Sequence, residues 1–147
     1  MSETYHSHGI RFEYPENWEL SEQRSSDETT ITVESPDTSF WSLSLFYGGT
    51  TPEDVLDTAV SALQEAYQEV DVYPSKARVG EQERVGRDVE FVCFELINSA
   101  FLRAFQTEEF TALIYYQGTD HELVEVRPIL EAISGSLTWE PAADEED

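Results

Sequence analysis

Apolar and polar residues alternate along the first third of the chain, which is the pattern of strands that bury one face. The stretch GIRFEYPENWEL alternates in this way around a proline turn, and TTITVES repeats the pattern. These segments predict strands at 10–14, 18–22 and 29–35. In the next stretch, SFWSLSLFYGG, Trp41 and Leu43 share one face while Ser42 and Ser44 share the other, so we predict a fourth, half-buried antiparallel strand.

The apolar period then changes to three or four residues, which is typical of an amphipathic helix. Thr51 can cap its N-terminus, with Pro52 at the first helical position and Asp54 three residues on. The apolar stripe that follows consists of Leu56, Ala59, Val60, Leu63, Ala66 and Tyr67. We therefore predict a helix at about 51–68 that packs on a sheet.

Four more strand-like segments follow, separated by turn residues: VDVYPSKARVG, RVGRDVEFVCFEL, AFLRAFQTEE and FTALIYYQG. The second of them is apolar on both faces, since Phe91 and Cys93 alternate with Val92 and Phe94, and the fourth shows the same property. Two buried faces require a packed layer on each side of the sheet.

The last periodic segment predicts a second helix at about 120–135. Thr119 can cap it, with Glu122 in the third position of a capping box. Its apolar stripe consists of Leu123, Val126, Leu130, Ile133 and Leu137. Pro128 removes a backbone donor inside this stripe, so we expect a kink or a restart there, and Gly135 is expected to end the helix.

The order of strands, helix, four strands and helix predicts an α+β fold, an α/β/α sandwich with a mainly antiparallel sheet and helices on both faces. With the local stretches YPENW, TPEDVLDTAV, VGRDVEF and AISGSL, this order resembles the PsbP-like superfamily over residues 10–139. The resemblance implies a binding or accessory protein rather than an enzyme. It transfers no functional residue, because no position here matches a known site of that group.

The 147 residues fit one domain, and no linker or repeat divides them. We expect a single PsbP-like domain at 10–139, a flexible N-terminus at 1–9 and an acidic disordered tail at 140–147. The start of the sequence lacks the basic and apolar regions of a secretory signal, and no apolar run of about 18 residues suggests a membrane span. These features predict a cytoplasmic protein.

Acidic residues outnumber basic ones by 31 to 8, giving a net charge of −23. The terminal DEED accounts for a small part of this excess, so the charge is spread over the folded surface. Such a surface repels phosphate backbones and anionic headgroups, and we expect neither nucleic acid nor membrane as a partner. Dissolved cations would relieve the repulsion, so the composition resembles that of halophilic proteins; an acidic protein from ordinary salt is the alternative.

Few residues suggest metal or thiol chemistry. His6 and His8 lie two positions apart and would share one side of an extended chain, where Glu3 or His121 could join them around zinc or copper. In a flexible terminus they would lack rigid support, so we expect no metal site. The single Cys93 lies in the run VEFVCFEL and is interpreted as a buried core thiol.

The sequence also lacks a recognisable catalytic motif. Gly48 and Gly49 precede a helix N-terminus, where a phosphate can bind. The P-loop lysine and spacing are missing, and Glu53 and Asp54 occupy the first turn, so we interpret this segment as a plain turn. There is no G-x-S-x-G stretch. We predict no catalytic residue and no cofactor.

Aromatic residues exceed what a small core needs, and some of them can form a patch for a partner. The candidate partner-binding aromatics are Trp18, Trp41 and Tyr73, with core packing as the alternative for each. The sequence therefore favours a non-enzymatic binding or accessory protein that recognises an unidentified protein or small ligand in a high-salt cytoplasm. The alternative is an enzyme or small-molecule carrier whose pocket is built from residues scattered in the sequence.

Overall fold

The computed structural model describes residues 2–79 and 82–140. These residues form two helices and ten strands: β1 (Ser2–Ser7), β2 (Ile10–Pro15), β3 (Glu19–Arg24), β4 (Glu28–Glu34), β5 (Phe40–Phe46), α1 (Pro52–Ala66), β6 (Gln68–Val79), β7 (Gln82–Cys93), β8 (Leu96–Gln106), β9 (Thr111–Thr119), α2 (Asp120–Gly135) and β10 (Thr138–Trp139).

Both helices begin where the sequence places their caps. The Thr51 hydroxyl accepts a hydrogen bond from the Asp54 backbone N–H at 3.1 Å. The Thr119 hydroxyl accepts one from the Glu122 backbone N–H at 3.2 Å. The second helix ends at Gly135 as expected and continues through Pro128 as one helix, which excludes the restart and leaves the expected kink as a prediction.

The strands form two antiparallel sheets. The larger has seven strands in the order β3-β4-β5-β9-β8-β7-β6, and the smaller has three in the order β1-β2-β10. The central pair of the larger sheet joins distant parts of the chain, because β5 pairs with β9 and Ser44 lies opposite Leu113. This crossing places the two halves of the sequence in one continuous sheet.

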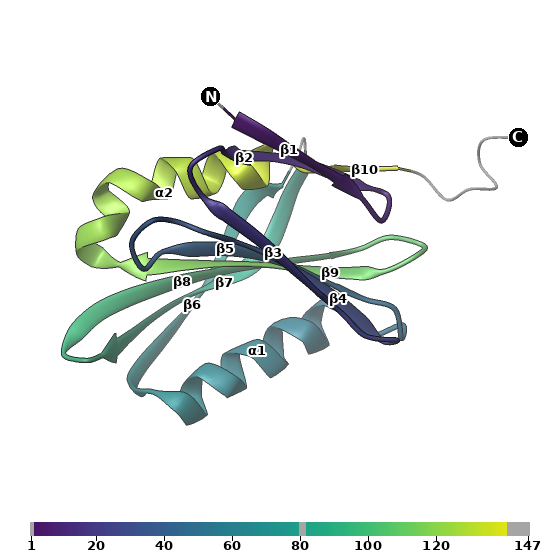
Figure 1. The fold of residues 1–147 in the computed structure, drawn as a ribbon. Helices are drawn as coiled ribbons and strands as arrows, with labels where there is room; N and C mark the ends of the chain where they lie inside the picture. Colours follow the sequence, from purple (N-terminus) through teal and green to yellow (C-terminus); the bar gives the residue numbers. More distant parts are fainter. Residues whose placement is uncertain (1, 80–81, 141–147) are drawn as a thin grey trace, which may run out of the picture.

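The two faces of the seven-stranded sheet carry different layers (Figure 1). The first helix, α1, lies on one face and contacts β6, β7, β8 and β9. The other face carries the three-stranded sheet together with α2. The hydrophobic core is correspondingly divided into a cluster around Trp41 and Phe12 and a second cluster around Leu56 and Leu102.

The expected α/β/α sandwich is wrong. Strands in two sheets dominate the described residues, which contain only the two helices, and one outer layer is largely a sheet. This outer layer contributes three buried side chains from β1 and β2 to the core: Tyr5, Ile10 and Phe12. They cover the sheet face on which a helical layer was expected.

The expected flexible N-terminus is also corrected. Residues Ser2–Ser7 form β1, which pairs along its whole length with β2. A turn with positive φ at His8 and Gly9 closes this hairpin. Of the tail expected at 140–147, only Glu140 lies within the described residues, where its backbone N–H donates to the Gly9 carbonyl.

Candidate functional site

The first helix covers only part of its sheet face. It contacts β6 through β9, while the same face of β3, β4 and β5 extends beyond it. Between the helix and this open strip lies a groove of about 420 Å³. We call it the α1 groove and define it by its lining, Glu28, Ser44, Phe46, Thr50, Val55, Thr58, Ala59, Ala62 and Leu113.

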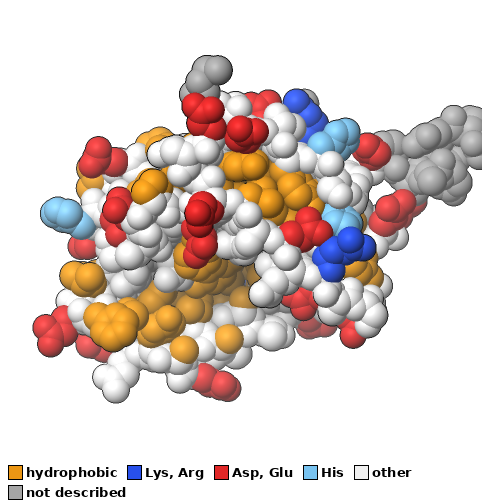
Figure 2. Space-filling view, in the orientation of Figure 1, with side chains coloured by type: hydrophobic (Ala, Val, Ile, Leu, Met, Phe, Trp, Pro, Cys, Tyr) orange, Lys and Arg blue, Asp and Glu red, His pale blue; other side chains and the backbone are white. Residues whose placement is uncertain are grey.

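The wall of the α1 groove that the helix forms is largely apolar. Ala59 and Ala62 are small, so the helix leaves room beside it, and Val55 closes the end near the helix N-terminus. From the sheet, Phe46 and Leu113 complete the apolar surface. Figure 2 shows hydrophobic side chains gathered in a band between the sheet and α1.

The strands beyond the apolar band carry hydroxyl groups. The Thr30 hydroxyl lies 3.1 Å from the Glu28 Oε2 atom, to which it donates, and 3.1 Å from the Ser44 hydroxyl. Thr32 pairs with Ser42 on the same face. These short side chains are held by the sheet and by one another, so they present fixed donors and acceptors with little entropy to lose on binding.

An aromatic pair continues the sheet surface past Leu113. Tyr115, two residues further along β9, stacks on Phe40 of β5 with the ring centroids 5.8 Å apart. Burial raises the pKa of the Tyr115 phenol, and the nearby Tyr67 adds to the effect. The phenol is therefore neutral at physiological pH, where its hydroxyl donates to the Gln117 amide oxygen.

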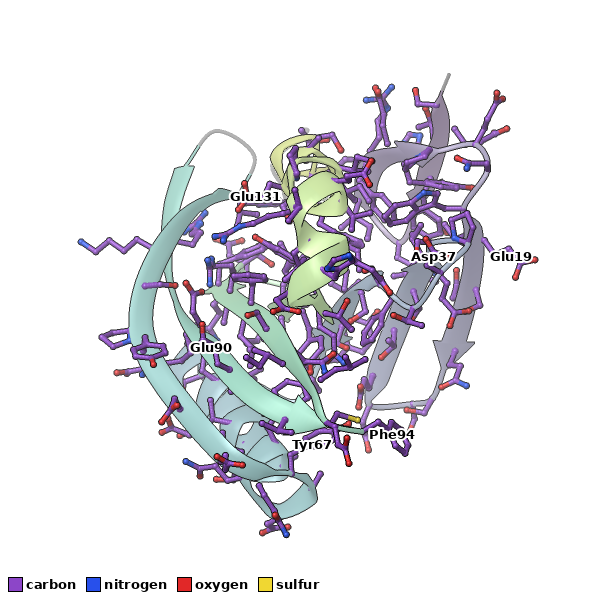
Figure 3. All side chains as sticks on the ribbon, turned by 90° about the vertical axis from the view of Figure 1, so that its left-hand side faces the viewer. Glu19, Asp37, Tyr67, Glu90, Phe94 and Glu131 are labelled. Carbon is purple, nitrogen blue, oxygen red and sulfur yellow. The ribbon has the colours of Figure 1, made fainter. Side chains whose placement is uncertain are left out.

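The end of this face near the C-terminus of α1 is marked by the β7–β8 turn (Figure 3). Tyr67 stacks on Phe91 at 4.3 Å, and Figure 3 shows Tyr67 and Phe94 near each other between α1 and the β3–β5 strands. The Phe94 side chain is 93% exposed. Phe94 and Glu95 both have positive φ, at 53° and 64°. This conformation costs a residue other than glycine about 1 kcal/mol.

The structure separates the three aromatics selected from the sequence. Trp41 is fully buried, and its indole N–H donates to the Ser134 hydroxyl at 2.8 Å. Trp18 is also buried, so both tryptophans are core residues and their selection as surface aromatics is corrected. Tyr73 is 47% exposed, but it lies on β6, at the far edge of the sheet from β4.

The histidines face separate carboxylates. A ring nitrogen of His6 lies 3.5 Å from Glu140, and one of His8 lies 3.0 Å from Glu22. Across residues 2–79 and 82–140, no three His, Cys, Asp or Glu side chains form a metal-binding group. Cys93, expected in the core, is only partly buried.

Sequence reasoning did not select the residues of the α1 groove. Ala59 was assigned to the buried stripe of the helix, and Ser44 to the solvent side of a strand, but neither assignment shows that the two meet. The number of strands was the signal that could have indicated a groove. Strands lie about 4.8 Å apart and a helix is about 10 Å wide, so one helix leaves part of a seven-stranded sheet face uncovered.

A second apolar pocket of about 360 Å³ lies between β2 and α2. It is lined by Tyr14, Pro15, Pro128 and Ile129, among others. Its polar lining residues are Ser2, Glu13 and Ser136, and the Ser136 hydroxyl is already bonded to the backbone of Glu13 and Ile133. The α1 groove is the larger of the two and is lined by Ser44, Thr50, Thr58 and Glu28 besides its apolar residues, so we take it as the candidate site.

The described residues form a strand-rich fold with two antiparallel sheets, two helices and an open, largely apolar groove. No protein-family model and no curated protein matches the chain. Among solved structures, LpqN of Mycobacterium tuberculosis, which is involved in cell envelope biogenesis, has a TM-score of 0.59 and 16% identity over 96% of this chain and 91% of LpqN.

Two further solved structures share the fold. PA94 of Pseudomonas aeruginosa, a protein of unknown function, has a TM-score of 0.59 and 11% identity over 96% of this chain and 99% of its own. A Bacteroides thetaiotaomicron protein has the same score and identity, and this chain spans 46% of its length. Identities this low show a common fold alone.

The described part of the chain contains no helix long and apolar enough to cross a membrane.

Proposed function

We propose that this protein is a binding or accessory protein that recognises its partner through the α1 groove. The observation that carries the proposal is the form of the groove, an open apolar surface of about 420 Å³ beside a row of fixed hydroxyls. Apolar area supplies affinity in such sites, and a few placed polar groups supply orientation. An open groove suits a ligand that keeps one side in water.

The competing proposal is an enzyme or small-molecule carrier. A catalytic pocket brings several titratable groups together and shifts their pKa values. Among the residues that line the α1 groove, Glu28 is the only titratable one, and its carboxylate accepts a hydrogen bond from Thr30. A single hydrogen-bonded carboxylate supports the binding role over acid–base catalysis.

The proposal extends to family and location. The order of elements in the sequence supports membership of the PsbP-like superfamily, although the solved structures that share the fold carry other names. The net charge of −23 supports a high-salt cytoplasm and a partner that is neither nucleic acid nor membrane. The partner is an unidentified protein or small ligand, and no cofactor enters the proposal.

The fluorescence of 1-N-phenylnaphthylamine, a neutral apolar dye, tests the groove. We expect saturable enhancement with the wild-type protein and a loss of about tenfold in affinity when Ala62→Trp or Thr58→Trp fills the groove. Gln64→Trp is the matched control, because Gln64 is exposed on the same helix but does not line the groove. Dye binding that both filling variants leave unchanged would overturn the proposal.

A further inference from the structure

The open strip beside α1 has the width of one more helix. The strip consists of β3, β4 and β5, and two strand spacings of about 4.8 Å make it about 10 Å wide. Packed helices lie 8–10 Å apart, so a second helix on this face would sit directly over these strands. Thr58 and Ala62 present small side chains along the α1 side of the groove, which permits the closest approach between helix axes.

The chemistry of the groove changes across its width. Next to α1 the surface is apolar, with Phe46 and Leu113, and the aromatic ring of Tyr115 follows. One strand further from α1, β4 carries the Thr30 hydroxyl and the Glu28 carboxylate, and the Ser44 hydroxyl lies between them and Leu113. A ligand that matches this surface is apolar along one side and polar along the other.

The charges around the groove have one predominant sign. The sequence of α1 contains four acidic residues and no basic residue: Glu53, Asp54, Asp57 and Glu65. None of the four lines the groove itself, but Asp57 and Glu65 lie next to Thr58 and Ala62 on the helix. Glu28 adds a fifth carboxylate on the sheet side, and Arg24 at the end of β3 is a basic side chain that borders it. Charge complementarity therefore favours a cationic ligand over an anionic one.

The strained β7–β8 turn supplies a second observation at the far end of the same face. Hairpins of this kind prefer Asn-Gly because both central residues have positive φ. Here the positions hold Phe94 and Glu95, and the Phe94 ring is 93% exposed. A bulky aromatic ring that is held exposed in an unfavourable backbone conformation makes Phe94 a candidate contact residue.

We propose that the α1 groove receives a basic amphipathic helix of a partner protein, which lies alongside α1 and reaches the Phe94 ring. A helix that matches the 15 residues of α1 is about 22 Å long, or about four turns. Its apolar side contacts Phe46 and Leu113, and its lysine or arginine side chains face the carboxylates. This inference rests on the proposed function, since it names the class of ligand for the same groove.

Two designed, fluorescently labelled peptides of about 15 residues test the inference by anisotropy. One places leucines at helical spacing with lysines elsewhere, and the other replaces every lysine by glutamate. In about 0.15 M potassium chloride we expect the lysine peptide to bind at least about tenfold more tightly. Binding should weaken about tenfold in Ala62→Trp and stay unchanged in Gln64→Trp.

The salt dependence separates groove binding from general attraction to an acidic surface. At about 2 M potassium chloride, exposed charges are screened within about 2 Å, so a peptide held by charge alone would dissociate. We expect the lysine peptide to retain saturable binding that Ala62→Trp still weakens. Complete loss at high salt, or indifference to Ala62→Trp at both salt concentrations, would overturn the inference.

The turn variants test the role of the Phe94 ring. Glu95→Gly relieves one strained position and keeps the ring, whereas Phe94→Asn/Glu95→Gly creates a favourable turn without it. We expect both variants to have a higher Tm than the wild type. Glu95→Gly should bind the lysine peptide with unchanged affinity, and Phe94→Asn/Glu95→Gly should bind it several-fold more weakly. Equal affinity in the two variants would exclude Phe94 from the site.

The outcomes distinguish the two proposals. If both peptides bind equally well and Ala62→Trp weakens both, the groove is the binding site but the ligand is not selected by charge. If neither the dye nor either peptide responds to the groove-filling variants, the proposed function itself is wrong.

Discussion

At the scale of single residues, Glu22 shows how a surface carboxylate joins the two sheets. It lies on β3 and accepts a hydrogen bond from the Tyr5 hydroxyl of β1 at 2.8 Å. Its other oxygen lies 3.0 Å from a ring nitrogen of His8 and 3.9 Å from Arg24. The hydrogen bonds from Tyr5 and His8 lower the pKa of the Glu22 carboxyl below its ordinary value.

This shift predicts a pH-dependent contribution to stability. Because the folded-state pKa lies below the unfolded value of about 4.3, the unfolded chain binds more protons near that pH. The contribution is therefore complete above about pH 5 and is lost as the pH falls through the folded-state pKa. We expect Glu22→Gln to lower Tm at pH 7, by an amount equivalent to about 1 kcal/mol, and to have a smaller effect as the pH falls below the unfolded-state pKa.

Thermal unfolding of the wild type and Glu22→Gln from pH 7 to pH 3 checks this expectation. Glu125→Gln is the control, because Glu125 is exposed on α2 and its substitution removes the same charge as Glu22→Gln does. A difference in Tm between wild type and Glu22→Gln that is as large at pH 3 as at pH 7 would contradict the assignment.

At the scale of elements, the β7–β8 pair depends on a close approach at Gly86. This residue lies opposite Arg103, which is 2% exposed and donates to the Asp88 carboxylate at 2.9 Å. A Cβ atom at Gly86 would lie 1.9 Å from the Leu102 carbonyl oxygen and 2.8 Å from the Arg103 Cδ atom. The strand pair therefore has no room for a side chain at this position.

We predict that Gly86→Ala destabilises the protein by about 2 kcal/mol or more, because the backbone of two paired strands must move. Gly48→Ala is the matched control, since nothing lies within 4 Å of its Cβ position. Urea unfolding of both variants gives the comparison. Equal midpoints would show that β7 and β8 can separate at this point without cost.

The elements also differ in how well the sequence predicted them. Both helices were predicted close to their observed bounds, because caps and apolar stripes are local features within about 16 residues. The strand β1 was missed, since only Tyr5 among its residues is buried and no alternation is visible. Its conformation depends on pairing with β2, which local sequence does not encode.

At the scale of the whole molecule, the net charge of −23 dominates the electrostatics. The described residues contain few ion pairs, and most of these are exposed, like the one between Arg127 and Glu131. Exposed pairs contribute about 0–1 kcal/mol each, so they offset little of the repulsion among the other carboxylates. Dissolved cations must supply most of the screening.

We therefore predict that the folded state gains stability as salt rises, since it is more compact than the unfolded chain and is more affected by repulsion. Thermal unfolding near neutral pH in about 0.05 M and about 2 M potassium chloride measures the effect, and sucrose controls for general exclusion from the surface. A Tm that is flat or falls with salt would remove the physical basis for the halophilic interpretation.

The sequence by itself determined the two helices, most of the strands and the sign of the surface charge. Caps and apolar periodicity are set by residues close together in the sequence, and the net charge depends only on composition. Tertiary structure decided the order of the strands, the sheet that replaces part of the expected helical layer, and the burial of Trp18 and Trp41. It also decided the α1 groove, where Ser44 and Leu113 meet although 69 positions separate them. Such features depend on contacts between distant residues, whose free energy is gained only when the whole chain has folded.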